Sequence, residues 1–481
     1  MELNEEKLKE LLQKEPFTRG MEDNIISSLS TAINVGDTEM ADIPDIKRHT
    51  ISQSVYAKEL DPAAHDIHSD KNVPSIVVKL DKGNYQEIKD TRMALAYQRK
   101  IVEKQVLYTC GKPTKFTLCN TKPSKEQKSD YIDIKTAWRN KNYDIIRTEA
   151  IEKQKSIGDA AVLQYMKDGK VMAKTFSYLD GYTLIPIFDK FGYLEQFCFL
   201  YSQRNKRKLD VYDKEYFYEY ILGEDNTTAT LINTTPHGFR QVPVSYIRKE
   251  VAWENAQSII EVLEIIYNIY SVIMKRHGWG LLYIKGNVDS KMKKLAGSVI
   301  LQDNSDNPNS TAEFKAPPTP TGMENLISDL RKQIQIMTGT IFITPEDVRM
   351  SGDISGAAIK MMNSSAYEKA MKDAMGYDDF MDSMLSIFIE GYANEMKRSA
   401  QYSTLNIRAE LDVWIPQSDT EIVTNLTLLK NSNLISTESG TEISPYSTPD
   451  EIQRIESEKA TAIKETNQQQ TNINNNANNP T

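Results

Sequence analysis

Apolar residues recur at spacings of three and four over residues 253–276, the most regular helical pattern in the chain. The apolar stripe consists of Ile259, Val262, Leu263, Ile266, Ile269, Tyr270 and Ile273. At about 1.5 Å per residue this helix spans on the order of 35 Å, and an apolar face of that length requires a partner. The candidate partner is a helix over residues 322–342, where a matching stripe is formed by Leu326, Leu330, Ile334 and Met337.

From the end of a predicted helix at residue 156 to about residue 250, the pattern changes to short runs typical of strands. Asp168-Gly169 supplies the positive φ angles of a type I′ turn and joins predicted strands over 161–166 and 171–176. Two more hairpins are predicted, with strands over 182–188 and 193–201, and over 209–221 and 227–232 around a turn at 223–226. Successive hairpins produce antiparallel sheets, so this half of the chain is predicted to be α+β rather than a parallel doubly wound domain.

Further helices are predicted on both sides of this strand-rich region. They cover residues 1–35, 92–107, 130–156, 354–400, 421–431, 437–443 and 449–466. The helix over 92–107 runs into Gly111-Lys112-Pro113, a glycine stop followed by proline. Short strands are predicted over residues 281–284, 298–301 and 405–413.

A connector with an unusual composition lies between two of the long helices. Residues 338–367 read TGTIFITPEDVRMSGDISGAAIKMMNSSAY. Thr344-Pro345-Glu346-Asp347 is a helix-start signal, with a capping hydroxyl, a proline at the first helical position and an acid three residues after the cap. Gly352 and Gly356 permit sharp turns of the backbone. By spacing alone, this segment is an ordinary connection between helices.

Composition limits the classes of protein to consider. The chain has 481 residues, 40% hydrophobic and 26% charged, which is enough for several structural units with a sizeable core. Its net charge of −9 argues against a protein that wraps nucleic acid with a basic surface. The charge is compatible with a conduit through which DNA slides, and equally with an ordinary acidic cytoplasmic protein.

The cysteines and the apolar runs indicate a reducing compartment. Cys110, Cys119 and Cys198 form no CxxC pair and leave an odd residue, so free thiols are expected. The N-terminus is charged, without the apolar core of a signal peptide. Continuous apolar runs are far shorter than the roughly 20 residues that span a bilayer. A soluble, intracellular protein without membrane contact is therefore expected.

Candidate chemistry is sparse. His65 and His68 lie near Asp61, Asp66 and Asp70, but no third ligand is specified, so a solvated loop is predicted rather than a metal site. Two Gly-Lys pairs lack the frame of a phosphate-binding loop, and no GxSxG element occurs. Five scattered histidines offer little for general acid–base catalysis. No catalytic residue, metal or cofactor is predicted.

A lysine cluster lies between the two long amphipathic helices. It consists of Lys285, Lys291, Lys293 and Lys294. Such a cluster is most often a solvated turn, but it could also contact phosphate or the acidic surface of a partner.

The order of these segments resembles that of bacteriophage portal proteins of the SPP1-like class. The connector resembles the tunnel loop of that family, where an SG-[small]-[small]-[aliphatic]-K segment opens the next helix, here Ser355-Gly356-Ala357-Ala358-Ile359-Lys360. The passage LYTCGKPTKF resembles the portal wing, and the series WIPQSD, LKNSNLISTES and TPDEIQRI resembles the portal crown. The resemblance covers roughly residues 90–460, and the N-terminal 90 residues match poorly.

The resemblance implies a portal fold with an α/β wing, a two-helix stem, a small β-containing clip and a helical crown. The implied parts are an N-terminal segment (1–90), the wing (91–252), a stem helix (253–277), the clip (278–320), a second stem helix (321–342), the tunnel loop (343–353), a long helix (354–404), the crown (405–466) and a disordered, Asn-rich tail (467–481). The tunnel loop would line the DNA channel with Thr344, Glu346, Asp347, Arg349, Ser351, Gly352 and Asp353. The lysine cluster would then face partners at the clip.

The family's role implies a structural protein of the virion, assembled in the host cytoplasm, and not an enzyme. A ring, dodecameric in virions, would occupy one capsid vertex and pass double-stranded DNA during packaging and ejection. Its partners would be the terminase large subunit, the major capsid and scaffolding proteins, and a head-completion or adaptor protein. Two alternatives remain open at this point: another ring-forming connector or tail protein, or a soluble α+β enzyme.

Overall fold

The computed structural model describes residues 53–69, 76–79, 85–88, 92–222, 229–277, 281–285, 301–303, 311–315, 321–342, 363–398, 402, 404–414, 419–444, 446, 451 and 454–461. The helices predicted over 1–35, the turn at 223–226 and the Asn-rich tail lie outside these residues. The chain forms two compact units, one of residues 1–342 and 365–414, the other of residues 343–364 and 415–481. Helices and antiparallel sheets are mixed, which confirms the predicted α+β class.

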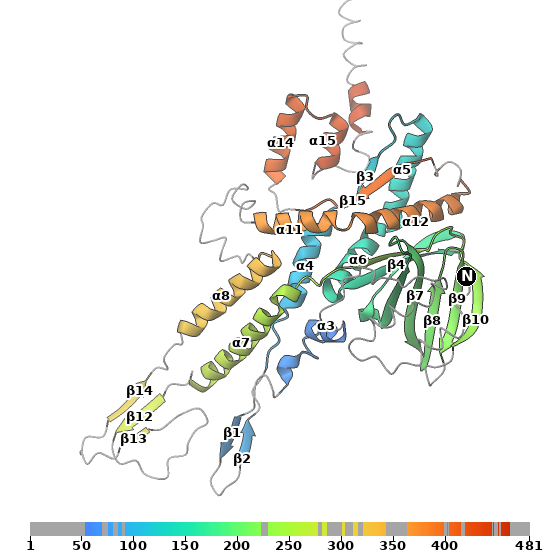
Figure 1. Cartoon of the computed structure of the whole chain (residues 1–481). Coiled ribbons are helices and arrows are strands. Elements are labelled where there is room, and N and C mark those ends of the chain that lie inside the picture. The colour runs from blue at the N-terminus through green and yellow to red at the C-terminus, as the bar shows by residue number, and fades with distance from the viewer. Residues whose placement is uncertain are drawn as a thin grey trace, which may run out of the picture. The chain divides into compact units, whose positions relative to one another are not determined.

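Two sheets are formed by residues 159–248 of the first unit (Figure 1). The first has the order β11-β4-β5, from strands Val244–Arg248, Asp159–Lys167 and Lys170–Phe176. The second has the order β10-β9-β8-β7-β6, from strands Ala229–Pro236, Tyr216–Leu222, Lys206–Tyr212, Leu194–Gln203 and Tyr182–Phe188. All neighbouring strands are antiparallel, as the hairpin pattern predicts.

Alternation along β4 divides the interior into two clusters. Ala160 and Val162 face the helices, whereas Ala161 and Leu163 pack with the five-stranded sheet. The helices α4 (Tyr97–Cys110), α5 (Lys125–Asn140), α6 (Tyr143–Ile157) and α12 (Asp378–Met396) supply nearly half of the first cluster. Trp138 of α5 lies fully buried within it.

The Asp168-Gly169 turn is confirmed, but the strand predicted over 209–221 is wrong. Asp168 and Gly169 have φ angles of 52° and 73°. The single predicted strand is two strands, β8 and β9, because the Asp213 carboxylate accepts hydrogen bonds from the backbone N–H of Glu215 and Tyr216 and closes a turn.

Two predicted long helices are interrupted. The helix expected over 130–156 divides into α5 and α6 at Asn142, whose φ of 60° is a left-handed value that Asn tolerates. The helix expected over 354–400 is, in its described part, α11 (Ser364–Met375) followed by α12. The break falls at Gly376 and Tyr377; a Cβ at Gly376 would meet the Nζ atom of Lys249.

The two long amphipathic helices pair as predicted. α7 (Gln257–His277) and α8 (Thr321–Thr338) lie side by side (Figure 1). The strands beyond their ends form a sheet of order β13-β12-β14, from Leu301–Asp303, Leu281–Lys285 and Thr311–Lys315. The sequence did not indicate β14; of the strand predicted over 298–301, only residue 301 is described, and it belongs to β13.

By length and composition, residues 254–274 could cross a membrane, and they are the one such helix among the described residues. Core helices of soluble proteins pass the same test. Glu264 and Asn268 lie within this range with side chains buried against other parts of the chain. Pairing with α8 and with residues 92–95 covers the buried polar residues of α7 and part of its apolar face, whereas Val262 and Ile269 remain exposed.

Smaller elements complete the two units. In the first, α3 (Gln53–Leu60) packs on α6, β1 (Ile76–Lys79) pairs with β2 (Tyr85–Ile88), and β3 (Lys115–Leu118) pairs with the predicted strand β15 (Ile407–Glu410). In the second, α14 (Asp419–Asn431) and α15 (Thr437–Ile443) confirm two predicted helices, and Ser436 caps α15. Of the helix predicted over 449–466, the described residues 451 and 454–461 are helical.

Candidate functional site

Most residues that the sequence assigned to function fall outside the described part of the chain. These are Thr344, Glu346, Asp347, Arg349, Ser351, Gly352 and Asp353 of the connector, and Lys291, Lys293 and Lys294 of the lysine cluster. Lys285 is the last residue of β12 and pairs with Thr311 of β14. The structure therefore describes the two helices on either side of the connector, α8 and α11.

The end of α8 lies against the beginning of α11. Gly339, directly after α8, has a φ of 59°. A Cβ at this position would lie 3.1 Å from Cβ of Lys369 and 3.8 Å from the carbonyl oxygen of Ser365, so a side chain would push the two helices apart. The flanks of residues 343–362 are thus neighbours.

We call this junction between the end of α8 and the beginning of α11, with the side chains of α4 and α6 that contact it, the loop base. Apolar contacts form one part of it. Ile341 packs with Tyr108 of α4 and with Ala366 and Ala370 of α11. Trp414 stacks on Tyr108 with ring centroids 6.2 Å apart. The connector is therefore anchored on α4 at both ends.

Gln105 of α4 connects the end of α8 to a buried ion pair. Its Nε2 donates to the carbonyl oxygen of Thr338 at 2.9 Å and lies 3.2 Å from Oγ1 of Thr340. Its Oε1 accepts from Nζ of Lys155 on α6 at 3.1 Å. Lys155 in turn donates to the carboxylate of Asp373 on α11. One continuous network thus runs from α8 through α4 and α6 to α11.

The pKa values of the ionisable side chains at the loop base are shifted. Burial lowers the pKa of Lys155, and the nearby Lys369 adds to this effect, while Asp373 opposes it. Burial alone would raise the pKa of Asp373, but the charges and hydrogen bonds of Lys155 and Lys369 outweigh it and lower the pKa. Asp373 is therefore held as a carboxylate between two lysines.

Tyr377 forms a second branch of the loop base. Its hydroxyl donates to Oε1 of Gln154 at 2.7 Å, and Nε2 of Gln154 lies 3.3 Å from the carbonyl oxygens of Lys249 and Glu250. The ammonium of Lys249 lies 4.2 Å from the centroid of the Tyr377 ring. Burial, together with the charges of Lys155 and Lys369, lowers the pKa of Lys249 to about 8, against the opposing charges of Asp373 and Asp379.

Replacing Lys249 by methionine is expected to stabilise the chain at pH 7 and to lose this effect at alkaline pH. The folded chain binds the Lys249 proton more weakly than the unfolded chain does, so the charge costs stability below about pH 8, and the cost disappears as the pH rises to 10.5. After a discount for partial exposure, the gain at pH 7 is about 1–2 kcal/mol. Urea unfolding of both proteins from pH 7 to 10.5 measures it; a gain that does not shrink with pH would contradict the assignment.

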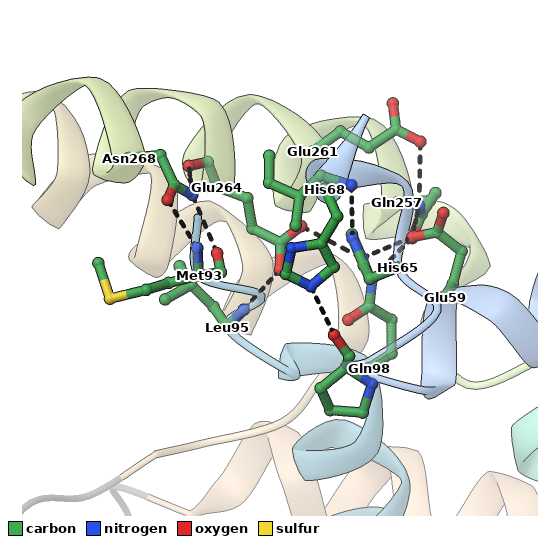
Figure 2. Close-up of polar contacts among 12 residues, drawn as sticks. Glu59, His65, His68, Met93, Leu95, Gln98, Gln257, Glu261, Glu264 and Asn268 are labelled. Atoms are coloured by element: carbon green, nitrogen blue, oxygen red, sulfur yellow. Dashed lines mark hydrogen bonds and ion pairs between the residues drawn. The ribbon is translucent and has the colours of Figure 1, made fainter. Parts of the chain in front are cut away.

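A second polar cluster lies where residues 59–98 cross α7 (Figure 2). The imidazole Nε2 of His65 is 3.0 Å from Oε2 of Glu59 and 3.3 Å from Oε2 of Glu264, and all three side chains are buried. The predicted solvated loop is therefore wrong for His65, which caps a short 3-10 helix (Asp66–His68) and accepts from the N–H of Ile67. His68 remains exposed and contacts the carbonyl oxygen of Pro62.

This cluster also determines where α4 begins. The backbone N–H of Met93 donates to Asn268, whose amide donates back to the Met93 carbonyl oxygen, and the N–H of Leu95 donates to Glu264 (Figure 2). Residues 92–96 therefore stay outside the helix and bind α7, and α4 begins at Tyr97 rather than at residue 92 as predicted.

Neither polar cluster was anticipated, although the sequence contains a signal for each. Gln257, Glu261, Glu264 and Asn268 recur at spacings of four, three and four on α7, a polar stripe that reads as solvent-facing but lies largely under residues 59–98. In α4, Gln98 and Gln105 interrupt the apolar stripe that includes Ile101. A polar residue inside an apolar stripe signals a buried hydrogen-bond network.

Among the described residues, no group of three or more His, Cys, Asp or Glu side chains could hold a metal ion. His65 contacts the two glutamates and the backbone N–H of Ile67.

Comparison with known proteins identifies one family. The profile of phage portal proteins described as SPP1 Gp6-like matches residues 43–465, most of the chain. No curated protein matches the chain. The matched range contains every described element, including the loop base and the α7–α8 pair.

Proposed function

This chain belongs to the SPP1 Gp6-like family of phage portal proteins, and we propose that it forms the ring through which double-stranded DNA is packaged by the terminase and later ejected. The family is structural and implies a head–tail connector at the capsid vertex of the virion, assembled as an oligomeric ring. The proposed copy number is twelve. A ring closes through repeated head-to-tail contacts between identical chains.

The main support for the channel role is that the two flanks of the connector meet at the loop base. Because the flanks of residues 343–362 are neighbours, we propose that the connector forms a closed excursion rather than a bridge between distant parts. Repeated around a ring, such excursions can surround a central object. We propose that residues 343–353 do so, with Glu346, Asp347 and Asp353 repelling phosphates and Arg349 attracting them, so that DNA is held loosely.

The paired helices and their sheet suit the remaining parts of a portal. We propose that α7 and α8 form the stem wall and that residues 278–320, with Lys285 and the lysines at 291, 293 and 294, form the clip that faces the terminase and the head-completion protein. Contacts with the major capsid and scaffolding proteins, and assembly in the host cytoplasm, follow from the same role.

Mass measurement of the purified protein, with negative-stain images of the same sample, tests the proposal. Rings near twelve times 54.8 kDa with a central hole are expected. Co-purification with a terminase would distinguish a portal from another connector or tail ring. A monomer that binds a small ligand would overturn the proposal.

Replacing Ile336 by aspartate is expected to reduce ring formation while the chain still folds. Ile336 of α8 is 69% exposed in a single chain, and further large apolar side chains of this helix pair are exposed, namely Val262, Ile269, Leu326 and Met337. Covering such a side chain by a neighbour contributes about 1.5–3 kcal/mol, and an aspartate would bury a charge instead. Because every interface carries the change, the ring fraction should fall by more than about tenfold.

Size-exclusion chromatography with light scattering measures this fraction. Ile145 of α6 is 65% exposed and lies outside the helix pair, so Ile145→Asp is the matched control and should leave rings intact. Equal ring fractions for the two variants would place the ring contact elsewhere.

A further inference from the structure

The loop base contains more positive than negative charge. Lys155 of α6 and Lys369 of α11 both bind the carboxylate of Asp373, and the charge of Lys249 interacts with the same carboxylate. Lys155 is 3% exposed, so its ammonium has left water almost completely. Asp373 thus faces three lysines from three segments, of which Lys249 also interacts with Asp379, and the loss of Asp373 would increase the repulsion among them.

The network reaches α8 through directional hydrogen bonds. Lys155 donates to Gln105, and Gln105 donates to the last carbonyl group of α8, at Thr338. The partners are far apart in sequence, with 218 residues between Lys155 and Asp373 and 233 between Gln105 and Thr338. The two helices that flank residues 343–362 are therefore connected to each other through α4 and α6, in addition to their direct apolar contact.

We infer that Asp373 and Lys155 are positioning residues for the channel segment: their ion pair fixes the end of α8 and the beginning of α11 in one arrangement, an inference that rests on the proposed function. Buried ion pairs are weak contributors to stability, because desolvation offsets most of the attraction between the charges. Apolar side chains could also hold α8 against α11, but apolar contacts are not directional and would not fix the position of one helix along the other. The ion pair and Gln105 provide donors and acceptors that fit in one geometry.

Hydrogen exchange on assembled rings tests this inference directly. In Asp373→Asn rings, we expect the amides of residues 338–342 to exchange about tenfold faster than in wild type, because α8 loses its fixed neighbour. In Asp373→Glu rings, which keep the charge, most of the protection should remain. Glu149→Gln, which breaks the exposed ion pair with Lys153 on the same helix α6, should leave these amides unchanged.

DNA retention separates positioning from stability. Asp373→Asn rings should form normally but retain several-fold less DNA. Ile151→Val, in the same core, removes one buried methyl group and destabilises the chain moderately, so it shows what destabilisation alone does to retention.

Unchanged exchange at 338–342 in Asp373→Asn would overturn the inference, as would an equal loss of DNA in Ile151→Val. If wild-type rings conduct no DNA, the proposed function fails, whereas the exchange result still reports on the coupling of the two helices.

Discussion

Rings in which residues 344–353 are replaced by a short Gly-Ser linker are expected to assemble but to lose most of their packaged DNA. The flanks of this segment are held together by α4 and by the loop base, so removing the excursion leaves the anchoring contacts in place. Because every copy in a closed ring carries the change, the DNA retained per particle should fall by about tenfold or more. The amount of nuclease-protected DNA per particle measures this loss, and electron microscopy monitors whether the rings assemble.

Two further variants identify what the segment contributes. A Gly-Ser replacement of the original length keeps the excursion but removes Glu346, Asp347, Arg349 and Asp353, so it isolates the charges. Arg349→Gln alone should weaken retention and reduce its dependence on salt, since the positive charge that attracts phosphates is lost. Normal packaging and normal retention with the shortened segment would refute the channel assignment.

Replacing Trp138 by alanine is expected to lower the free energy of unfolding by about 3–5 kcal/mol, which is a large share of the stability of a typical domain. The ring is fully buried, with its centroid 5.5 Å from that of Phe116, 4.8 Å from that of Tyr143 and 5.3 Å from that of Phe388. Its Nε1 also donates to Asp144 at 3.2 Å. The substitution therefore creates a cavity among three aromatic rings and leaves an acceptor with one hydrogen bond fewer.

Urea unfolding followed by far-UV circular dichroism measures the loss. Ile132 is 58% exposed on the same helix α5, and Ile132→Ala should change stability by less than about 0.5 kcal/mol. A similar loss in both variants would mean that the exposed face of α5 contributes as much as its buried face, because alanine is the better helix former and propensity cannot cause a loss. A loss below about 1 kcal/mol for Trp138→Ala would show that the cavity collapses after truncation.

Local chemistry made part of the fold predictable. The turn at Asp168-Gly169 follows from two residues that accept positive φ angles, and the pairing of α7 with α8 follows from matching apolar stripes. The regions that the sequence did not predict are those where local patterns continue through a change of structure. Helical periodicity runs across Asn142 and Gly376, yet both helices break there.

The two polar clusters show why the structure of residues 92–96 and of His65 could not be predicted from local sequence. Residues 92–96 have a helical pattern but are not helical, because Met93 and Leu95 bind Asn268 and Glu264 on α7, 175 and 169 residues away. The same holds for His65, whose local sequence is typical of a solvated loop and whose two acidic partners lie on separate helices. Such hydrogen bonds depend on which segments meet, and no local window contains that information.

The sequence by itself determined the α+β class, the hairpins, the two long amphipathic helices and the order of segments that identifies the portal family. Each of these depends on spacing along the chain or on residues a few positions apart. Only the tertiary structure decided that α8 and α11 meet at one base and that Lys155, Asp373 and Gln105 join them. The physical reason is that a buried charge is tolerated only beside its partner, and here the partners come from helices separated by more than two hundred residues.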